Sequence, residues 1–158
     1  MAHATTLSRR QLLRRSTALA AAGIAAPYII PSGILAFQGK PGANDRIGVG
    51  GIGIGRQGSG VLHGAVSSKA CRFIGIADVL LSRAQEMCKR LGGGDAYQDY
   101  RKLLERKDVD AIVTATPDHW RALVTIHACQ AGKDVYAEKA LSLTVREGRL
   151  MVQAARKY

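Results

Sequence analysis

The chain contains 158 residues, which allows one domain and disfavours two complete ones. Hydrophobic residues make up 47% of the chain, so a disordered chain is excluded, and the formal net charge is +11. Nearly half of the excess charge lies in residues 1–44, and the rest forms no basic stripe with interleaved aromatic residues, which argues against a nucleic-acid-binding protein.

Residues 1–44 form a segment of their own. Residues 8–14 carry a twin-arginine pattern, and an apolar run of about ten residues then ends at Pro27. Because about 20 apolar residues are needed to cross a bilayer, stable membrane insertion is not expected. The segment resembles a bacterial twin-arginine (Tat) export signal, which implies a periplasmic protein; a basic N-terminus without an export role is the alternative. Residues 27–44 are predicted to be a linker to a domain at 45–158.

From residue 45 onward, buried apolar runs alternate with helical patterns. Strands are predicted at 46–52, 71–77, 110–114 and 135–137. Helices are predicted at 57–67, 82–91, 99–106 and 119–131, and a capping box at 144–147 begins the last one. This alternation predicts parallel βαβ units, and so an α/β fold with a Rossmann-type doubly wound sheet. The sequence offers no physical reason for three glycines, Gly48, Gly50 and Gly51, inside the first strand.

The first strand leads into a G-x-G-x-x-G turn, which predicts a dinucleotide site. The candidate cofactor-binding residues are Gly53, Ile54, Gly55, Arg56, Gln57 and Gly58. The first glycine permits the tight turn, the second lets a pyrophosphate approach the backbone, and the third lets the helix pack against the sheet. The helix N-terminus then offers free N–H groups and a partial positive charge to the phosphates.

An acid closes the second strand at the distance that this motif requires. Asp78 lies about 20 residues after the last glycine of the turn. Its carboxylate is expected to accept hydrogen bonds from the adenosine ribose hydroxyls. The same negative charge would repel a 2′-phosphate, so NAD is the predicted cofactor and NADP is disfavoured.

Cysteine spacing predicts neither a disulfide framework nor a metal site. Cys71, Cys88 and Cys129 are odd in number, lie far apart and lack CxxC spacing. We expect three buried small hydrophobic residues instead.

Two further motifs point to a family. The segment TPDHW at 116–120 follows one buried strand, and Glu138-Lys139 follows the next. With the glycine turn, Asp78 and the string GKDVYAEKALSLT, residues 43–158 resemble the N-terminal domain of the Gfo/Idh/MocA oxidoreductases, in particular members that carry Tat signals.

The resemblance implies a dinucleotide-dependent enzyme that acts on sugars, polyols or related hydroxyl compounds. It places Thr116 and Pro117 against the cofactor and His119 near the nicotinamide. It also assigns Glu138 to the cofactor site and makes Lys139 the catalytic residue, because a positive charge there would stabilise a developing alkoxide. Complete relatives are often homo-oligomers.

Two residues depart from the family pattern, and one aromatic residue is given a packing role. Ala140 replaces the proline of a Glu-Lys-Pro motif, so a looser turn around the lysine is expected. Arg121 stands where relatives often have a second histidine. Trp120 is expected to be a core anchor rather than a substrate platform.

Length is the larger departure. Relatives continue into a second α/β domain that binds substrate and supplies an acid–base pair. The resemblance therefore implies a truncated Rossmann domain, incomplete at its C-terminal edge, that binds NAD weakly, is catalytically incomplete alone and leaves an apolar face uncovered. Three functions stay open: an NAD-dependent oxidoreductase, an NAD-dependent glycosidase that oxidises the sugar transiently, and an inactive cofactor-binding module.

Overall fold

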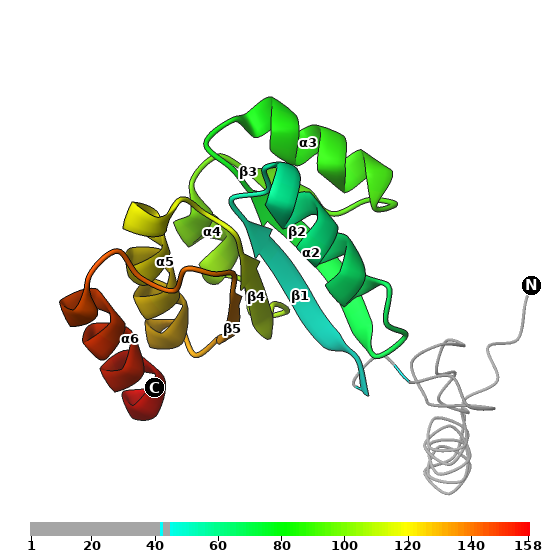
Figure 1. The fold of residues 1–158 in the computed structure, drawn as a ribbon. Coiled ribbons are helices and arrows are strands. Elements are labelled where there is room, and N and C mark those ends of the chain that lie inside the picture. Colours follow the sequence, from blue (N-terminus) through cyan, green and yellow to red (C-terminus); the bar gives the residue numbers. More distant parts are fainter. Residues whose placement is uncertain (1–41, 43–44) are drawn as a thin grey trace, which may run out of the picture. The chain divides into compact units, whose positions relative to one another are not determined.

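A computed structural model describes Gly42 and residues 45–158, so the predicted export signal and most of the linker lie outside the described residues. Within the described range the strands are β1 (Ile47–Ile52), β2 (Cys71–Ala77), β3 (Asp95–Tyr97), β4 (Ala111–Thr114) and β5 (Asp134–Ala137). The helices are α2 (Arg56–Val66), α3 (Leu81–Arg90), α4 (Tyr100–Leu104), α5 (Asp118–Gln130) and α6 (Val145–Lys157). Strands and helices alternate along the chain (Figure 1).

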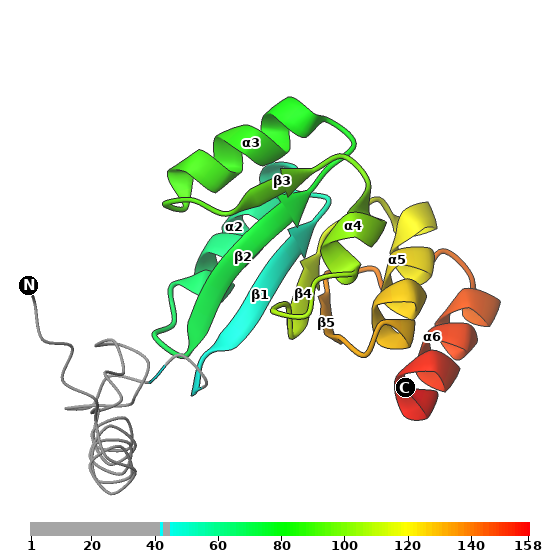
Figure 2. The same cartoon turned by 180° about the vertical axis from the view of Figure 1, so that it is seen from behind.

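The strands form one parallel sheet in the order β3-β2-β1-β4-β5. The chain runs outward from β1 to one edge and then returns to β4 on the other side of β1, so the carboxyl ends of β1 and β4 flank the point where the order reverses. Helices α2 and α3 cover one face, and α4 and α5 cover the other (Figures 1 and 2). Helix α6 packs against α5. The predicted doubly wound α/β fold is confirmed.

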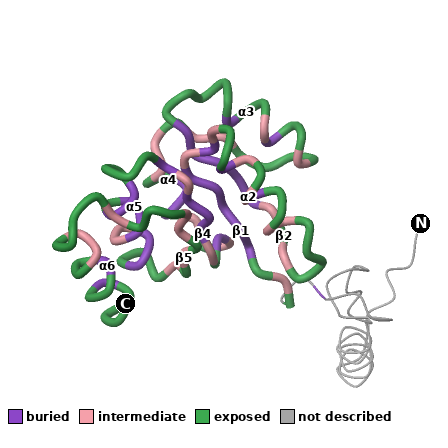
Figure 3. The backbone as a smooth tube through the Cα atoms, in the orientation of Figure 1, coloured by how far each residue is buried: buried purple, intermediate pink, exposed green. Residues whose placement is uncertain are grey.

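Each face of the sheet has its own hydrophobic core, because the central strands are apolar on both sides (Figure 3). Ile52, Ile112 and Val124 belong to the core under α4 and α5. Val49, Leu62 and Ile76 belong to the core under α2 and α3. The sheet is therefore sandwiched between two packed layers, and its carboxyl edge is free to form a site.

The three glycines of β1 lie where no side chain would fit. A Cβ at Gly48 would lie 2.0 Å from the backbone oxygen of Asp108. One at Gly51 would meet the side chains of Leu62 and Ile54 at 2.7 and 2.8 Å, and one at Gly50 would lie 3.1 Å from Ile112 on the opposite face. Bare main chain in β1 therefore lets the surrounding elements close tightly over both faces of the sheet.

Most predicted elements are confirmed within one or two residues, and the helix caps act as expected. The Asp99 carboxylate accepts a hydrogen bond from the Arg101 N–H, and Thr144 and Glu147 form the predicted capping box. Helix α4 ends two residues earlier than predicted, at Leu104. The short strand β3 was not predicted.

Two of the three cysteines are buried as expected. Cys88 and Cys129 are buried, and burial raises the pKa of each thiol, whereas Cys71 is only half-buried. Exposed apolar side chains gather at β5 and the start of α6, where Tyr136 and Val145 are 61% and 86% exposed.

No helix of the described residues has both the length and the apolar character needed to cross a membrane.

We predict that Gly48→Ala destabilises the protein and that Gly64→Ala does not. At position 48 the new methyl group would collide with backbone, which cannot rotate away, so we expect a loss of about 2 kcal/mol in the free energy of unfolding. Gly64 on α2 has open space around it, and alanine there should stabilise the helix by up to about 1 kcal/mol. Urea unfolding followed by circular dichroism compares the two variants; equal effects would contradict the packing explanation.

Candidate functional site

A cleft of about 560 Å³ opens at the carboxyl edge of the sheet, beside the ends of β1, β2 and β4. Its volume falls in the usual range for a small-molecule site. Six of the predicted site residues line it: Gly53, Gly55, Asp78, Thr116, Pro117 and His119. Parallel strands bring these residues together because their carboxyl ends share one edge, although the residues come from three separate segments of the chain.

The turn after β1 requires glycine at its first position for two reasons. Gly53 has a φ of +72°, a conformation that residues with a side chain rarely adopt. A Cβ there would also lie 2.5 Å from the Thr116 side chain. The main chain of the turn therefore packs directly against Thr116 in the loop after β4, which closes one side of the cleft.

The third glycine of the turn packs as the motif predicts, and the second has open space beside it. A Cβ at Gly58 would lie 2.7 Å from the Gly53 carbonyl oxygen, so the third glycine lets α2 approach the turn. A Cβ at Gly55 would meet nothing within 4 Å, so the space beside it is open. Gly55 is the N-cap of α2, and no side chain caps the helix or places an acid in its first turn. The uncapped N–H groups and the open space suit a phosphate.

Asp78 connects β2 to the glycine turn. Its carboxylate accepts hydrogen bonds from the N–H groups of Ile54 at 3.0 Å and Leu80 at 2.9 Å. Arg83 on α3 donates to both carboxylate oxygens, at 3.2 and 3.3 Å. Asp78 is only 4% exposed, whereas the Arg83 side chain is 45% exposed. Arg83 can therefore turn to solvent, while a ligand hydroxyl and the two backbone N–H groups keep hydrogen bonds to the buried Asp78 carboxylate. Sequence reasoning missed Arg83.

The loop after β4 supplies the opposite wall of the cleft. Thr114 and Thr116 are buried and their hydroxyls lie 3.3 Å apart. Pro117 precedes α5, whose first residues include His119 and Trp120. Trp120 is 49% exposed and lines the cleft, so its expected role as a core anchor is wrong. It lies on the outer side of the first turn of α5, where no layer covers it.

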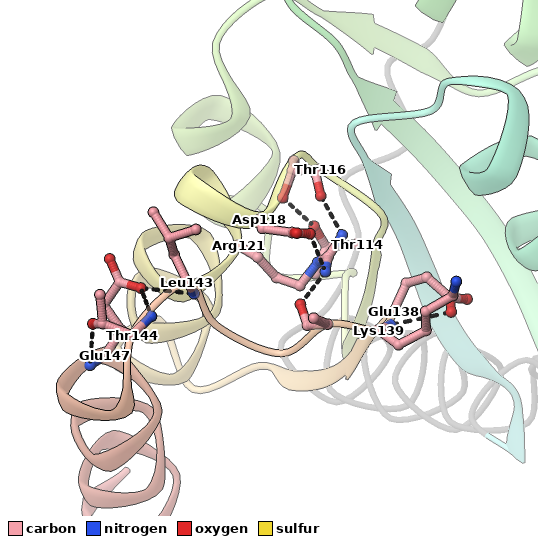
Figure 4. Close-up of polar contacts among 10 residues, drawn as sticks. Thr114, Thr116, Asp118, Arg121, Glu138, Lys139, Leu143, Thr144 and Glu147 are labelled. Carbon is pink, nitrogen blue, oxygen red and sulfur yellow. Dashed lines mark hydrogen bonds and ion pairs between the residues drawn. The ribbon is translucent and has the colours of Figure 1, made fainter.

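The Glu-Lys pair follows β5 at the same edge of the sheet. The Glu138 N–H donates to the Thr114 carbonyl oxygen, and the Glu138 carboxylate accepts from the Lys139 N–H at 3.1 Å. Neither Glu138 nor Lys139 lines the cleft itself, and Lys139 is exposed. The peptide bond between Lys139 and Ala140 is cis. The pair therefore lies beyond the cleft wall, past β4 (Figure 4).

Arg121 joins the two loops after β4 and β5 (Figure 4). It donates hydrogen bonds to the carbonyl oxygens of Thr116 and Ala140, and it pairs with Asp118 at 3.0 Å. Arg121 is only 4% exposed. The turn at Ala140, which was expected to be looser without proline, is thus held by a hydrogen bond from Arg121 on α5. No local pattern in the sequence signals this contact, because its two partner loops are far apart along the chain.

Strand β3 brings Gln98 and Tyr100 to the cleft, and sequence reasoning missed both. The Tyr100 hydroxyl lies 2.8 Å from Nδ1 of His127, and the two rings stack. Burial raises the pKa of the Tyr100 hydroxyl above its ordinary value, so it stays protonated at neutral pH and can donate to the imidazole. This pair stiffens the side of the cleft under α4.

Four residues of the glycine turn lie outside the main cleft. Ile54 and Arg56 line a smaller hollow of about 180 Å³ that shares Gly55 and Arg83 with it, and Gln57 and Gly58 line neither. Ile54 is buried in the core and acts in the turn through its N–H. Within residues 45–158, no group of three or more histidine, cysteine or acidic side chains could hold a metal ion.

Comparison with known proteins agrees with this geometry. The model of an oxidoreductase family with an NAD-binding Rossmann fold matches residues 46–158. A glycosyl hydrolase family 109 protein from Shewanella pealeana is 29% identical over 94% of the chain and 37% of its own length. The myo-inositol 2-dehydrogenase of Thermotoga maritima is 32% identical over 71% of the chain and 33% of its own length. The chain thus spans about a third of the length of these relatives.

Solved structures with a similar sequence identity share the fold. A 3-ketoreductase from Actinomadura kijaniata, crystallised with NADP and TDP-benzene, superimposes with a TM-score of 0.66 at 31% identity, over 70% of this chain and 35% of its own. A probable dehydrogenase from Thermotoga maritima gives a TM-score of 0.67 at 30% identity, over 70% of this chain and 33% of its own.

We predict that Asp78→Asn destabilises the protein far more than Asp99→Asn. The buried Asp78 carboxylate accepts from two backbone N–H groups and Arg83, and an amide can accept through one oxygen only, so we expect a loss of about 2 kcal/mol. Asp99 is a partly exposed N-cap, a position where asparagine works as well, and its ion pair with Arg101 lies at the surface, so its change should be small. Thermal unfolding measures both; similar losses would show that Asp78 does not hold the turn.

Proposed function

Because the chain belongs to the Gfo/Idh/MocA oxidoreductase family and carries its NAD-binding Rossmann fold, we propose that it is the cofactor domain of an enzyme that oxidises or reduces a sugar, a polyol or a related hydroxyl compound by hydride transfer. The names of similar proteins support this substrate class, since they include inositol dehydrogenases and a levoglucosan dehydrogenase. The substrate is thus expected to be a small molecule rich in hydroxyl groups.

The observation that carries the proposal is the uncapped start of α2 beside Gly55. Its N–H groups have no side-chain partner, and the open space at Gly55 would admit a diphosphate. Anions bind at such helix N-termini because the amide groups and the helix dipole both favour negative charge. The residues present therefore fit a dinucleotide.

Asp78 supports NAD over NADP. The carboxylate lines the cleft next to the glycine turn, where it would accept hydrogen bonds from the ribose hydroxyls in place of those from Arg83. A 2′-phosphate at the same place would meet this buried negative charge.

The remaining site residues would act at the other end of the cofactor. Bound NAD would supply the hydride acceptor. Thr116, Pro117 and His119 line the cleft there and would orient the nicotinamide and exclude water. Glu138 holds the backbone N–H of Lys139, whose ammonium would stabilise the charge that develops on the substrate oxygen as its proton leaves.

A second reaction is supported by one group of relatives. Several matching proteins are glycosyl hydrolases of family 109, at 29–33% identity. The alternative is therefore a glycosidase that oxidises its sugar transiently on bound NAD and reduces it again before release. The cofactor site described above would serve both reactions.

We also propose that residues 1–44 export the protein to the periplasm. The twin arginines Arg9 and Arg10, followed by a short apolar run, support a Tat-type signal. A route for folded proteins suits one that must close around a soluble cofactor before it leaves the cytoplasm.

We predict that NADH binds the protein and that Gly55→Val abolishes most of this binding. Trp120 is the only tryptophan of the chain and lines the cleft, so its excitation energy should transfer to bound NADH, which quenches the tryptophan fluorescence. A valine side chain would fill the open space at position 55 without a clash in the protein, so affinity should fall by about 10-fold or more while stability changes by less than about 1 kcal/mol.

Gly60→Val is the matched control, because position 60 on α2 is equally open but lies a turn away from the phosphate site. It should keep the wild-type affinity. An absence of energy transfer in the wild-type protein at millimolar NADH would contradict the proposed function.

We predict that the enzyme of which this chain is the proposed cofactor domain releases NADH in proportion to the sugar or polyol oxidised, measured by absorbance with inositols and hexoses as substrates. Net oxidation requires the reduced cofactor to leave with each turnover. Release of a free sugar from a nitrophenyl glycoside, with no net NADH, would instead identify the glycosidase.

A further inference from the structure

The buried guanidinium of Arg121 is the contact that ties the loop of Lys139 to the rest of the site. Arg121 lies in the first turns of α5, and its side chain is only 5% exposed. It donates to the carbonyl oxygens of Thr116 and Ala140 (Figure 4). Thr116 lines the cleft, and Ala140 directly follows Lys139. One side chain thus bridges the cofactor wall and the loop that carries the lysine.

Few other contacts hold this loop. Among the described residues, 139–142 receive no hydrogen bond from another element besides that of Arg121. Lys139 and Ala140 are both exposed, so packing does little to fix them. The position of the lysine therefore depends on the Arg121 bond on one side and on the end of β5 on the other.

Burial makes the Arg121 bridge hard to break. A guanidinium withdrawn from water must keep oxygen acceptors, because a stranded buried charge is very costly. Asp118 is half exposed and contacts one terminal nitrogen, and the two carbonyl oxygens are the other acceptors of the group, whose buried Nε has no partner. If the Ala140 carbonyl moved away, the charge would lose one of these acceptors. The charge therefore holds the loop in place.

The shape of the side chain suits this bridge. A planar guanidinium has five N–H donors in a fixed fork and can reach acceptors on separate segments, which a single ammonium or imidazole group cannot do equally well. Alanine at position 140 leaves its own φ free, whereas a proline ring would fix φ from within the loop.

We propose that Arg121 is a positioning residue that holds the loop of Lys139 beside the nicotinamide end of the cleft. It acts from α5 on the carbonyl oxygen of the residue that follows Lys139, and it also lines the cleft. This role rests on the proposed function, since it matters only where a dinucleotide occupies the cleft.

The test measures how well bound NADH shields Lys139 from acetylation by a water-soluble acetyl ester, with each lysine quantified by mass spectrometry. Lys69 is exposed near the opposite end of the sheet and serves as the internal reference. NADH should slow acetylation of Lys139 about 10-fold or more in the wild-type protein. In Arg121→Gln this shielding should fall to less than about threefold, because a charge-assisted bond that holds the loop is lost.

Two further readouts separate positioning from general stability. Affinity for NADH, measured through Trp120, should change by less than about threefold in Arg121→Gln, since the phosphate site is intact. Adding Ala140→Pro to Arg121→Gln should restore the shielding, because the proline ring fixes φ at position 140 and so limits the loop. Proline also breaks no hydrogen bond there, because the Ala140 N–H donates to no acceptor among the described residues. Arg149→Gln, an exposed arginine on α6, should match the wild type.

The experiment distinguishes a failure of the proposed function from a failure of the role proposed for Arg121. Wild-type protein that does not bind NADH would overturn the proposed function and this inference with it. Wild-type protein that binds NADH, together with unchanged shielding of Lys139 in folded Arg121→Gln, would overturn the inference alone. If Arg121→Gln does not fold, Arg121→Lys decides: it keeps the charge but cannot fork, so full wild-type shielding in that variant would overturn the bridge.

Discussion

The close approach of the turn after β1 to the loop after β4 is the constraint on which the whole site depends. A side chain at Gly53 would run into Thr116, and one at Gly58 would run into the Gly53 carbonyl oxygen. Because both positions carry only hydrogen, α2 begins directly at the edge of the sheet with its first N–H groups uncapped. Main chain rather than side chains therefore forms the edge of the proposed phosphate site, and the glycines of β1 extend the same tight packing through the sheet.

Two arginines connect the elements around this turn, and their burial gives them different roles. Arg83 holds Asp78 from a half-exposed position, so it can turn to solvent while ligand hydroxyl groups and backbone N–H groups donate to the buried carboxylate. Arg121 is buried and cannot release the carbonyl oxygens of Thr116 and Ala140 without stranding its charge. The end of the cleft beside Asp78 is thus adaptable, whereas the end toward Lys139 is held by the protein itself.

Features that depend on short-range chemistry were predicted well. Strand β2 was found at its bounds, and the caps at Asp99 and Thr144 act as expected, because each involves hydrogen bonds within a few residues or an uninterrupted apolar run. Strand β3 was missed, since three residues are too few for a pattern and the strand exists only through its pairing with β2. Trp120 was misassigned because its residue type favours burial, whereas its helix position leaves it at the open mouth of the cleft.

The sequence by itself determined the alternation of strands and helices, the glycine turn and the acid that follows β2, because backbone conformation and apolar periodicity are local properties of the chain. Only the tertiary structure decided what each side chain meets. It placed Arg83 on Asp78 and Arg121 between two distant loops, and it left Trp120 exposed. These contacts join segments that the sheet order brings together, and burial, which sets their strength, is a property of the packed molecule rather than of any residue alone.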